Sequence, residues 1–385
     1  MEKRARVIAY YLPQYHPIPQ NDHYWGKGFT EWTNVAKSRP LFRGHMQPRV
    51  PADLGFYDLR LDEVRQAQAD LAREAGIEGF CYWHYWFGDG EEVLEMPFNR
   101  LIETGKPDFP FCLGWANHDW TTKTWEKGKS KTVDTMIFKQ KYLGAADNEK
   151  HFYRLLPAFR DPRYIKVDGK LLFVLFSPLL LENIEGFMAQ WNELAKANGL
   201  EGFHFVANAH TLPDHMSLKN MRSLDEEVKK KVDRYLDFGV DAVTTVNLKR
   251  AEIRTGGRLK KVFYGALRRL KRMPAVEKYD FSRVMRNYYS PLDEQENVYP
   301  MMLAGWDRSP RSGGKAVVYY GDTPAAFREA AEMAVRRVEH KDPEHRIVFL
   351  NSWNEWGEGA YMEPDLRYGR AKLDALKEVL EENEG

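Results

Sequence analysis

The feature that most constrains the fold of this chain is an eightfold alternation of short apolar runs with longer amphipathic segments. Near-continuous apolar runs of five or six residues are typical of strands that are buried on both faces of a parallel sheet. The predicted strands are Arg6–Tyr11, Gly79–Trp83, Phe111–Trp115, Leu171–Phe176, Phe203–Ala207, Ala242–Val246, Tyr299–Leu303 and Arg346–Leu350.

The segments between these runs space their apolar residues three and four apart, which predicts helices that pack through one side. The clearest are Leu61–Ala75, Ile184–Ala197, Ala325–His340 and Leu366–Glu382. Eight strand-then-helix units in 385 residues predict an α/β fold, a (β/α)8 TIM barrel with long loops at the C-terminal face of the strands. We expect residues 1–385 to form a single catalytic domain of this type. The alternative, a doubly wound sheet, would carry a glycine-rich phosphate turn after the first strand, and Tyr11–His16 contains no glycine.

Two connections are much longer than the others. They follow the first and third predicted strands and cover residues 13–61 and 116–149. In a barrel, the loops after the strand C-termini build the active site, so substrate recognition is expected there.

Ten of the 11 tryptophans fall at or just after a predicted strand C-terminus, and only Trp191 lies on a helix. The ten are Trp25, Trp32, Trp83, Trp86, Trp115, Trp120, Trp125, Trp306, Trp353 and Trp356. Any single one is more often a core residue than a ligand contact. Their gathering on one rim nevertheless favours a ligand with apolar faces and polar edges, and a pyranose sugar has that shape.

A pair of carboxylates follows the last predicted strand, within the stretch 351–365. Glu355 and Glu358 alone would be a weak signal, because this spacing is common on solvated helix faces. Gly357 and Gly359 argue against a regular helix here, and neighbouring tryptophans make the surroundings apolar. Apolar surroundings raise the pKa of a carboxyl group, and two carboxylates in different environments are what glycoside cleavage needs.

Other kinds of site are not indicated. No His-x-His pair suggests a barrel metal site, no Cys-x-x-Cys pair exists, and neither a phosphate loop nor a nucleophile elbow is present. We therefore expect no metal and no cofactor. A net charge of +1 gives no pull toward nucleic acid. His16, His84, His118 and His210 lie on the predicted rim, where each is as easily an internal hydrogen-bonding group as a substrate contact.

The segment Lys249–Lys278 differs in charge from the rest, with 11 lysines and arginines against two glutamates. Within it, Leu259–Met273 has the pattern of a basic amphipathic helix. This helix could be an ordinary barrel helix that buries its apolar stripe, could contact an anionic membrane surface, or could bind an anionic glycan. The first apolar run of the chain ends at Pro13, too short for a signal peptide, and no run approaches the length of a membrane span, so we expect a cytoplasmic protein.

Several longer strings give the chain a family resemblance. They are Tyr11–His16, Gly28–Val35, Phe80–Phe87, Trp115–Asn117, Gly305–Asp307 and Trp353–Asp365. These strings resemble the WbsX-type proteins, relatives of glycoside hydrolase family 99 that are often encoded in bacterial polysaccharide gene clusters. The resemblance runs from about residue 6 to residue 366 and is weakest over 209–297. It implies a (β/α)8 barrel with a metal-independent site that acts on glycans.

The resemblance also implies roles for the two acids. Family 99 enzymes are retaining endo-mannosidases that act through a 1,2-anhydro sugar. By position, Glu355 matches the glutamate that deprotonates the sugar O2, and Glu358 matches the general acid/base, whose pKa we therefore expect to be raised. The chain departs from the family at Gly357, where family 99 tends to have a larger polar residue, and at His118, where WbsX relatives more often have a glutamate. Both departures concern sugar specificity.

We therefore predict a retaining, endo-acting glycoside hydrolase for a bacterial polysaccharide with α-manno or α-L-rhamno configured sugars, the configurations that place O2 trans to the leaving oxygen. The expected substrate contacts are Tyr11, His16, Trp32, Trp83, His84, Trp86, Trp115, Asn117, Trp306 and Trp356. One alternative is a glycosyltransferase of O-antigen assembly, although no Asp-x-Asp motif is present. Another is a catalytically idle glycan-binding barrel.

Overall fold

A computed structural model of the chain describes residues 3–121, 135–210, 223–270 and 276–381. Eight parallel strands form a barrel, which closes because β1 pairs with both β15 and β2. The barrel strands are β1 (Arg6–Tyr11), β2 (Gly79–Trp86), β4 (Phe111–Trp115), β8 (Lys170–Leu175), β9 (Phe203–His210), β10 (Ala242–Val246), β12 (Val298–Leu303) and β15 (Ile347–Asn351). All eight predicted strands are confirmed, and the closure excludes the doubly wound sheet.

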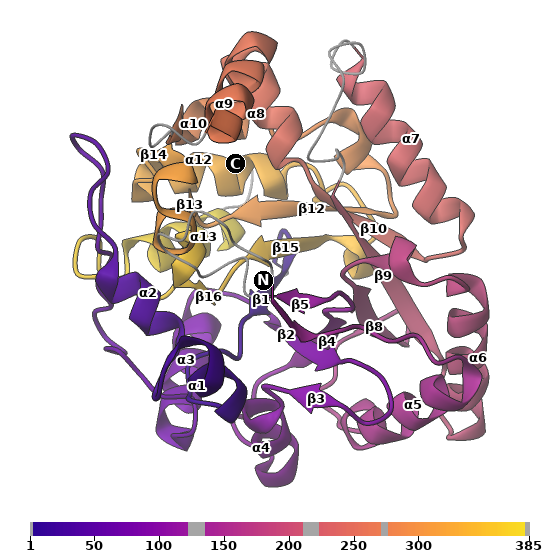
Figure 1. Cartoon of the computed structure of the whole chain (residues 1–385). Coiled ribbons are helices and arrows are strands. Elements are labelled where there is room, and N and C mark those ends of the chain that lie inside the picture. The colour runs from indigo at the N-terminus through magenta and orange to yellow at the C-terminus, as the bar shows by residue number, and fades with distance from the viewer. Residues whose placement is uncertain (1–2, 122–134, 211–222, 271–275, 382–385) are drawn as a thin grey trace.

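A helix returns after each barrel strand, and together these helices surround the barrel (Figure 1). They are α3 (Asp62–Glu74), α4 (Met96–Thr104), α5 (Ala145–Phe159), α6 (Ile184–Ala197), α7 (Leu224–Asp237), α8 (Leu248–Gly256), α12 (Pro324–Val335) and α13 (Ala371–Glu381). The bounds predicted for α6 are confirmed. Helix α13 begins later than predicted because Asp365 accepts hydrogen bonds from the backbone N–H groups of Arg367 and Tyr368, which makes a turn instead. Helix α12 ends at Val335, and 336–340 form turns.

Short elements decorate the barrel ends. The helices among them are α1 (Pro19–Trp25), α2 (Glu31–Lys37), α9 (Arg258–Leu270), α10 (Phe281–Arg286) and α11 (Ser309–Ser312), with single 3-10 turns η2 (Pro178–Leu180), η4 (Pro291–Glu294), η5 (Gly313–Lys315), η6 (Pro343–His345) and η7 (Trp356–Glu358). The short strands are β3 (Glu92–Val93), β5 (Trp120–Thr121), β6 (Met136–Phe138), β7 (Lys166–Val167), β11 (Glu277–Asp280), β13 (Trp306–Asp307), β14 (Val317–Tyr320), β16 (Asn354–Glu355) and β17 (Ala360–Tyr361). Within the described ranges, no helix has both the length and the apolar character needed to cross a bilayer.

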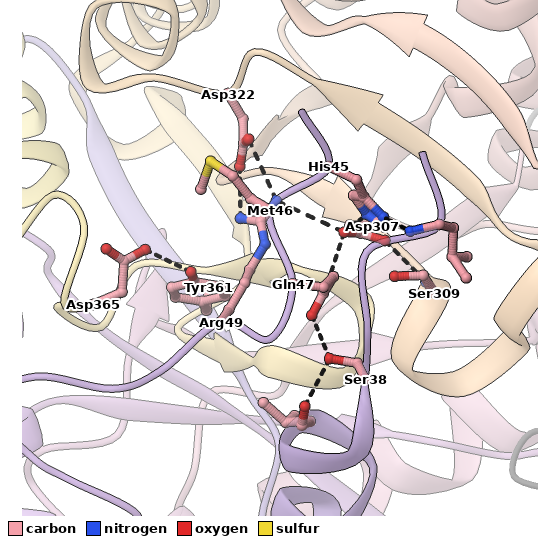
Figure 2. A network of polar contacts seen from close by, with 12 residues as sticks. Ser38, His45, Met46, Gln47, Arg49, Asp307, Ser309, Asp322, Tyr361 and Asp365 are labelled. Carbon is pink, nitrogen blue, oxygen red and sulfur yellow. Dashed lines mark hydrogen bonds and ion pairs between the residues drawn. The ribbon is translucent and has the colours of Figure 1, made fainter. Parts of the chain in front are cut away.

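A buried polar network fastens the long connection after β1 to the loops after β12 (Figure 2). His45 Nε2 lies 2.8 Å from Asp307 Oδ2, Gln47 Nε2 donates to the same oxygen at 2.7 Å, and Arg49 Nη1 donates to Asp322 Oδ2 at 2.7 Å. Burial alone would raise the pKa of Asp307, but the His45 hydrogen bond and the Arg49 charge outweigh it and lower this pKa to about 2. The network joins two segments that both border the cavity described next.

Candidate active site

A cavity of about 570 Å³ opens at the carboxyl ends of the barrel strands. This volume is within the range of small-molecule sites, ~300–1,000 Å³. Its lining comes from the ends of the barrel strands, from the segments that follow them and from the helices α8 and α9. Six of the lining residues are aromatic: Tyr10, Trp83, Tyr85, Trp120, Phe176 and Trp306. Both predicted acids, Glu355 and Glu358, line the same cavity.

The acids are placed by a tight hairpin after β15, in which β16 pairs with β17 around the 3-10 turn η7. Asn354 ties this hairpin to the chain after β1, because its side chain accepts from the Leu12 N–H at 2.7 Å and donates to the Leu12 carbonyl at 3.0 Å. The Tyr15 hydroxyl adds a bond to the Asn354 carbonyl. The absence of a regular helix here agrees with the prediction from the two glycines.

A buried arginine links Glu358 to a third carboxylate, Glu31, at the start of α2. Arg311 holds Glu31 through two bonds of 3.0 and 3.1 Å and donates to Glu358 Oε1 at 2.6 Å. A second arginine, Arg308, has its Nε 3.2 Å from the same Glu358 oxygen. Glu358 is therefore an ionised partner of two guanidinium groups.

Gly357 is required because Glu31 occupies the space beside it. A Cβ at position 357 would lie 1.5 Å from Glu31 Oε1, a distance that no side chain can accept. Gly359 is required for a different reason, since its φ of +61° is left-handed and a Cβ there would approach Asp307 to 2.7 Å. The departure from family 99 at Gly357 thus has a structural cause in this chain.

The pKa values of the two acids are displaced in opposite directions. Burial, helped by the nearby charge of Glu358, raises the pKa of Glu355 to about 8. Burial also acts on Glu358, but the charges of Arg308 and Arg311 and the Arg311 hydrogen bond outweigh it and lower the pKa of Glu358. The expected rise at Glu358 is therefore wrong for the free site, because the expectation did not include the arginines. At neutral pH the pair carries one proton, and Glu355 holds it.

Of the ten predicted substrate contacts, Trp83 and Trp306 line the cavity. Both are mostly buried, with 9% and 8% of their surface exposed. Trp83 stacks on Tyr10 at a centroid distance of 4.7 Å and meets Phe176 edge-on, so its position is set by the barrel wall.

The other four predicted tryptophans, Trp32, Trp86, Trp115 and Trp356, lie outside the cavity lining. Each indole N–H donates to an acceptor within the protein, over 2.6 to 3.2 Å. Trp356 also stacks on Tyr361 at 3.7 Å. For these rings the packing interpretation describes the arrangement. Trp125 lies outside the described residues.

The predicted polar contacts also lie away from the cavity lining. Tyr11 donates to Gln68 at 2.7 Å, His84 Nε2 lies 2.9 Å from His151 Nε2, and Asn117 donates to the Ser177 carbonyl at 2.9 Å. Burial lowers the pKa of His84 to about 3 and the pKa of His16 to about 4, so both imidazoles are neutral at physiological pH. His118 and His210 are the rim histidines that do line the cavity.

Sequence reasoning missed Glu31, Arg308 and Arg311. Glu31 is inside one of the strings that carry the family resemblance, and Arg308 directly follows another, so the resemblance could have pointed to both residues. Their association required the fold, because it joins α2, α11 and η7. No cluster of three or more His, Cys, Asp or Glu side chains placed to hold a metal ion occurs in the part of the chain that the structure describes.

Fold and site together define a (β/α)8 barrel with a pair of acids in a cavity at the carboxyl ends of its strands. The chain belongs to the family described as Glycosyltransferase WbsX, whose model matches residues 7–376. Two proteins of Xanthomonas campestris pv. campestris, both called uncharacterized protein WxcX, are 34% identical to it over 379 residues. That alignment covers 98% of this chain and 50% of each relative, so the chain spans about half the length of the curated relatives it matches.

Solved structures support the same class of fold. A glycoside hydrolase-like protein aligns with a TM-score of 0.61 and 14% identity, covering 100% of this chain and 95% of the other. A family 99 endo-α-mannosidase from Bacteroides thetaiotaomicron aligns with a TM-score of 0.51 and 13% identity, covering 99% and 96%. At such identities the likeness shows the fold alone.

Proposed function

We propose that this protein is a retaining, endo-acting glycoside hydrolase for a bacterial polysaccharide with α-manno or α-L-rhamno configured sugars. The observation that carries the proposal is the pair Glu355 and Glu358 in one cavity, with pKa values displaced in opposite directions. Such a pair holds one proton at neutral pH, which gives the site one acid and one base at the same time. Glycoside cleavage with O2 participation uses both.

In the first step, Glu355 as carboxylate accepts the proton of the sugar O2, and O2 attacks C1 to form the 1,2-anhydro sugar. The bond from C1 to the leaving oxygen breaks, and Glu358 supplies the proton that this oxygen needs. In the second step, water attacks C1 from the opposite face and gives its proton to Glu358. The epoxide opens, O2 recovers its proton from Glu355, and the configuration at C1 is retained.

These roles require the proton to be on Glu358 when the bond breaks, whereas the free site holds it on Glu355. Arg308 is the partner most able to yield, since its side chain is 37% exposed against 10% for Arg311. A sugar that displaces Arg308 from Glu358 would raise the pKa of Glu358 and favour transfer of the proton. The reverse assignment, with Glu355 as the acid, follows if Arg308 stays in place.

The aromatic lining supports a sugar substrate. Trp83, Trp306 and Phe176 line the cavity together with polar residues such as His210 and Asn208. This mixture suits a pyranose, which has apolar C–H faces and hydroxyl groups at its edges. The charged residues of the lining would then meet the hydroxyl groups or substituents.

A glycosyltransferase is the second candidate function, and the description of the WbsX family favours it. It would require an activated sugar donor, whereas a hydrolase requires only water. Release of reducing sugar from a panel of bacterial polysaccharides, with no nucleotide sugar added, separates the two. A catalytically idle glycan-binding barrel would bind a glycan in that panel and release nothing.

The roles of the two acids are tested with Glu355→Gln and Glu358→Gln, using Glu344→Gln at the amino end of the barrel as the control. Glu358→Gln should lose about 10²–10⁴-fold in rate on natural glycan and far less on an activated aryl glycoside, which needs little protonation. Glu355→Gln should lose both activities, because O2 then remains a weak nucleophile.

Three results would change this proposal. If Glu355→Gln is the variant that spares the aryl glycoside, the two roles are exchanged. If wild-type protein hydrolyses a 2-deoxy glycoside as fast as its parent, O2 does not participate. If both variants keep wild-type activity on natural glycan, the catalytic residues are elsewhere in the cavity.

A further inference from the structure

Helix α9 is amphipathic, but its polar side faces the protein. Lys261 forms an ion pair of 2.8 Å with Glu277 and a second one with Glu252, and both glutamates are buried. Lys260 lies on the same side, where its ammonium group donates to the Lys278 carbonyl at 2.6 Å and sits 3.9 Å from the centre of the Tyr279 ring. The helix is therefore attached to the barrel through charges.

The apolar side of α9 faces solvent. Leu259, Val262 and Phe263 are 83%, 44% and 58% exposed, and Ala266 is exposed as well. These positions follow the spacing of one helix face, so they form a continuous stripe. Surface helices of globular proteins usually turn such a stripe toward the core, and an exposed apolar stripe marks an interaction site. For Leu259, Val262 and Phe263 the interpretation as an ordinary barrel helix that buries its stripe is therefore wrong. Residues 271–273 of the predicted helix lie outside the described residues.

The charge of the helix indicates what covers the stripe. Its 13 residues include five lysines and arginines and no acid. Two of these bases face the protein: Lys261 is offset by the buried Glu252 and Glu277, and Lys260 contacts the Lys278 carbonyl and the Tyr279 ring, so these two add little charge at the surface. Arg258 is exposed next to Leu259. A second copy of the chain seated on this stripe would bring the same cations together, whereas an anionic lipid surface attracts them.

We propose that α9 docks on an anionic membrane surface, with Leu259, Val262 and Phe263 inserted at the boundary between headgroups and acyl chains. An apolar stripe flanked by bases is the pattern of helices that lie in this interface. Figure 1 shows α9 at the periphery of the barrel, beside α8 and α10. Because Lys261 lines the catalytic cavity from the inner side of the same helix, docking places the cavity next to the lipid surface.

The test is flotation of the full chain with vesicles of phosphatidylglycerol and phosphatidylcholine in equal parts, and with vesicles of phosphatidylcholine alone. We expect binding to the anionic vesicles at about 0.05 M salt and much weaker binding at about 0.5 M salt, where charges are screened within a few ångströms. Leu259→Ser/Phe263→Ser should weaken binding about tenfold or more. Arg258→Gln should weaken it about fivefold, since each base near an anionic leaflet contributes ~1 kcal/mol.

Leu366→Ser is the matched control, because Leu366 is 72% exposed on another part of the surface and should not affect binding. Equal binding to neutral and anionic vesicles, or unchanged binding of the double serine variant, would overturn the proposal. A concentration-dependent dimer that the double serine variant abolishes, without vesicle binding by wild type, would assign the stripe to a second copy instead. None of these measurements involves a glycan, so their outcome is independent of the proposed reaction.

Discussion

Replacing Arg311 with glutamine tests whether this arginine keeps two buried carboxylates ionised. Its side chain is 10% exposed, and those of Glu31 and Glu358 are 0% and 12% exposed. In the variant Arg311→Gln, Glu358 keeps Arg308 at 3.2 Å, but Glu31 loses both bonds that hold it. Glu31 should therefore account for most of the effect.

The magnitude follows from the burial of Glu31. Burial already raises the pKa of Glu31 above its usual value, and the charge and hydrogen bonds of Arg311 oppose that rise. Without Arg311, the pKa of Glu31 in the folded variant rises further, so the folded variant binds a proton that folded wild type does not. The loss of stability should reach about 3–5 kcal/mol once Glu31 must ionise. Between the two folded-state pKa values the loss grows with pH, by about 1.4 kcal/mol per pH unit.

Urea unfolding at pH 5 and at pH 8 measures this difference. We expect a small deficit for Arg311→Gln at pH 5 and a large deficit at pH 8. The double variant Arg311→Gln/Glu31→Gln should recover most of the stability at pH 8, because no charge is then left without a partner. A deficit that is equal at both pH values and persists in the double variant would refute the reasoning.

Three further predictions concern the cavity and its support. Trp83→Ala and Trp306→Ala should each weaken glycan binding by about 1–3 kcal/mol, measured by calorimetry on protein shown to be folded, and unchanged binding by both would make these rings structural. The kcat/KM profile should fall above pH about 8, where Glu355 loses the proton that the pair holds at lower pH, and a profile that stays flat well above this pH contradicts the assignment. Asp307→Asn should lose about 2–3 kcal/mol of stability at pH 7, because the fold lowers the pKa of Asp307 from 3.8 to about 2. This stabilisation is fully present above pH 3.8 and is lost as the pH falls through 2. Urea titrations that show the same loss at acid and at neutral pH would contradict this assignment.

The barrel could be predicted from sequence because its strands are buried on both faces, and each is therefore a nearly continuous apolar run. That Glu355 and Glu358 line one cavity could be predicted, because both lie in one short segment whose glycines disfavour a regular helix. Residues in a single loop reach the same site whatever the details of packing.

Which of the predicted sugar contacts line the cavity could not be predicted, because that depends on side-chain direction. Successive side chains of a strand point to opposite faces, so Trp83 and Tyr85 line the cavity while His84 and Trp86 do not. A position at a strand C-terminus places a ring at the carboxyl end of the barrel. It does not say whether the ring points into the cavity or toward the surrounding helices. Arg308 and Arg311 could not be predicted for another reason. Which cation lies beside Glu358 depends on how α11 packs against η7, and no local sequence pattern indicates that packing.

Because Glu31 fills the space beside Gly357, the residues at these two positions, which are far apart in the sequence, constrain each other. A relative with a side chain at the position of Gly357 has no room for a carboxylate placed like that of Glu31, and a relative that keeps this carboxylate must keep the glycine. The residues at positions 31 and 357 should therefore co-vary among homologues. Where Glu31 is replaced, the side chain that pairs with Arg311 is replaced as well. Sorting WbsX sequences by this pair would separate two groups. In one group a carboxylate at position 31 fixes the arginine that binds Glu358, and in the other group that arginine must be fixed by a different residue.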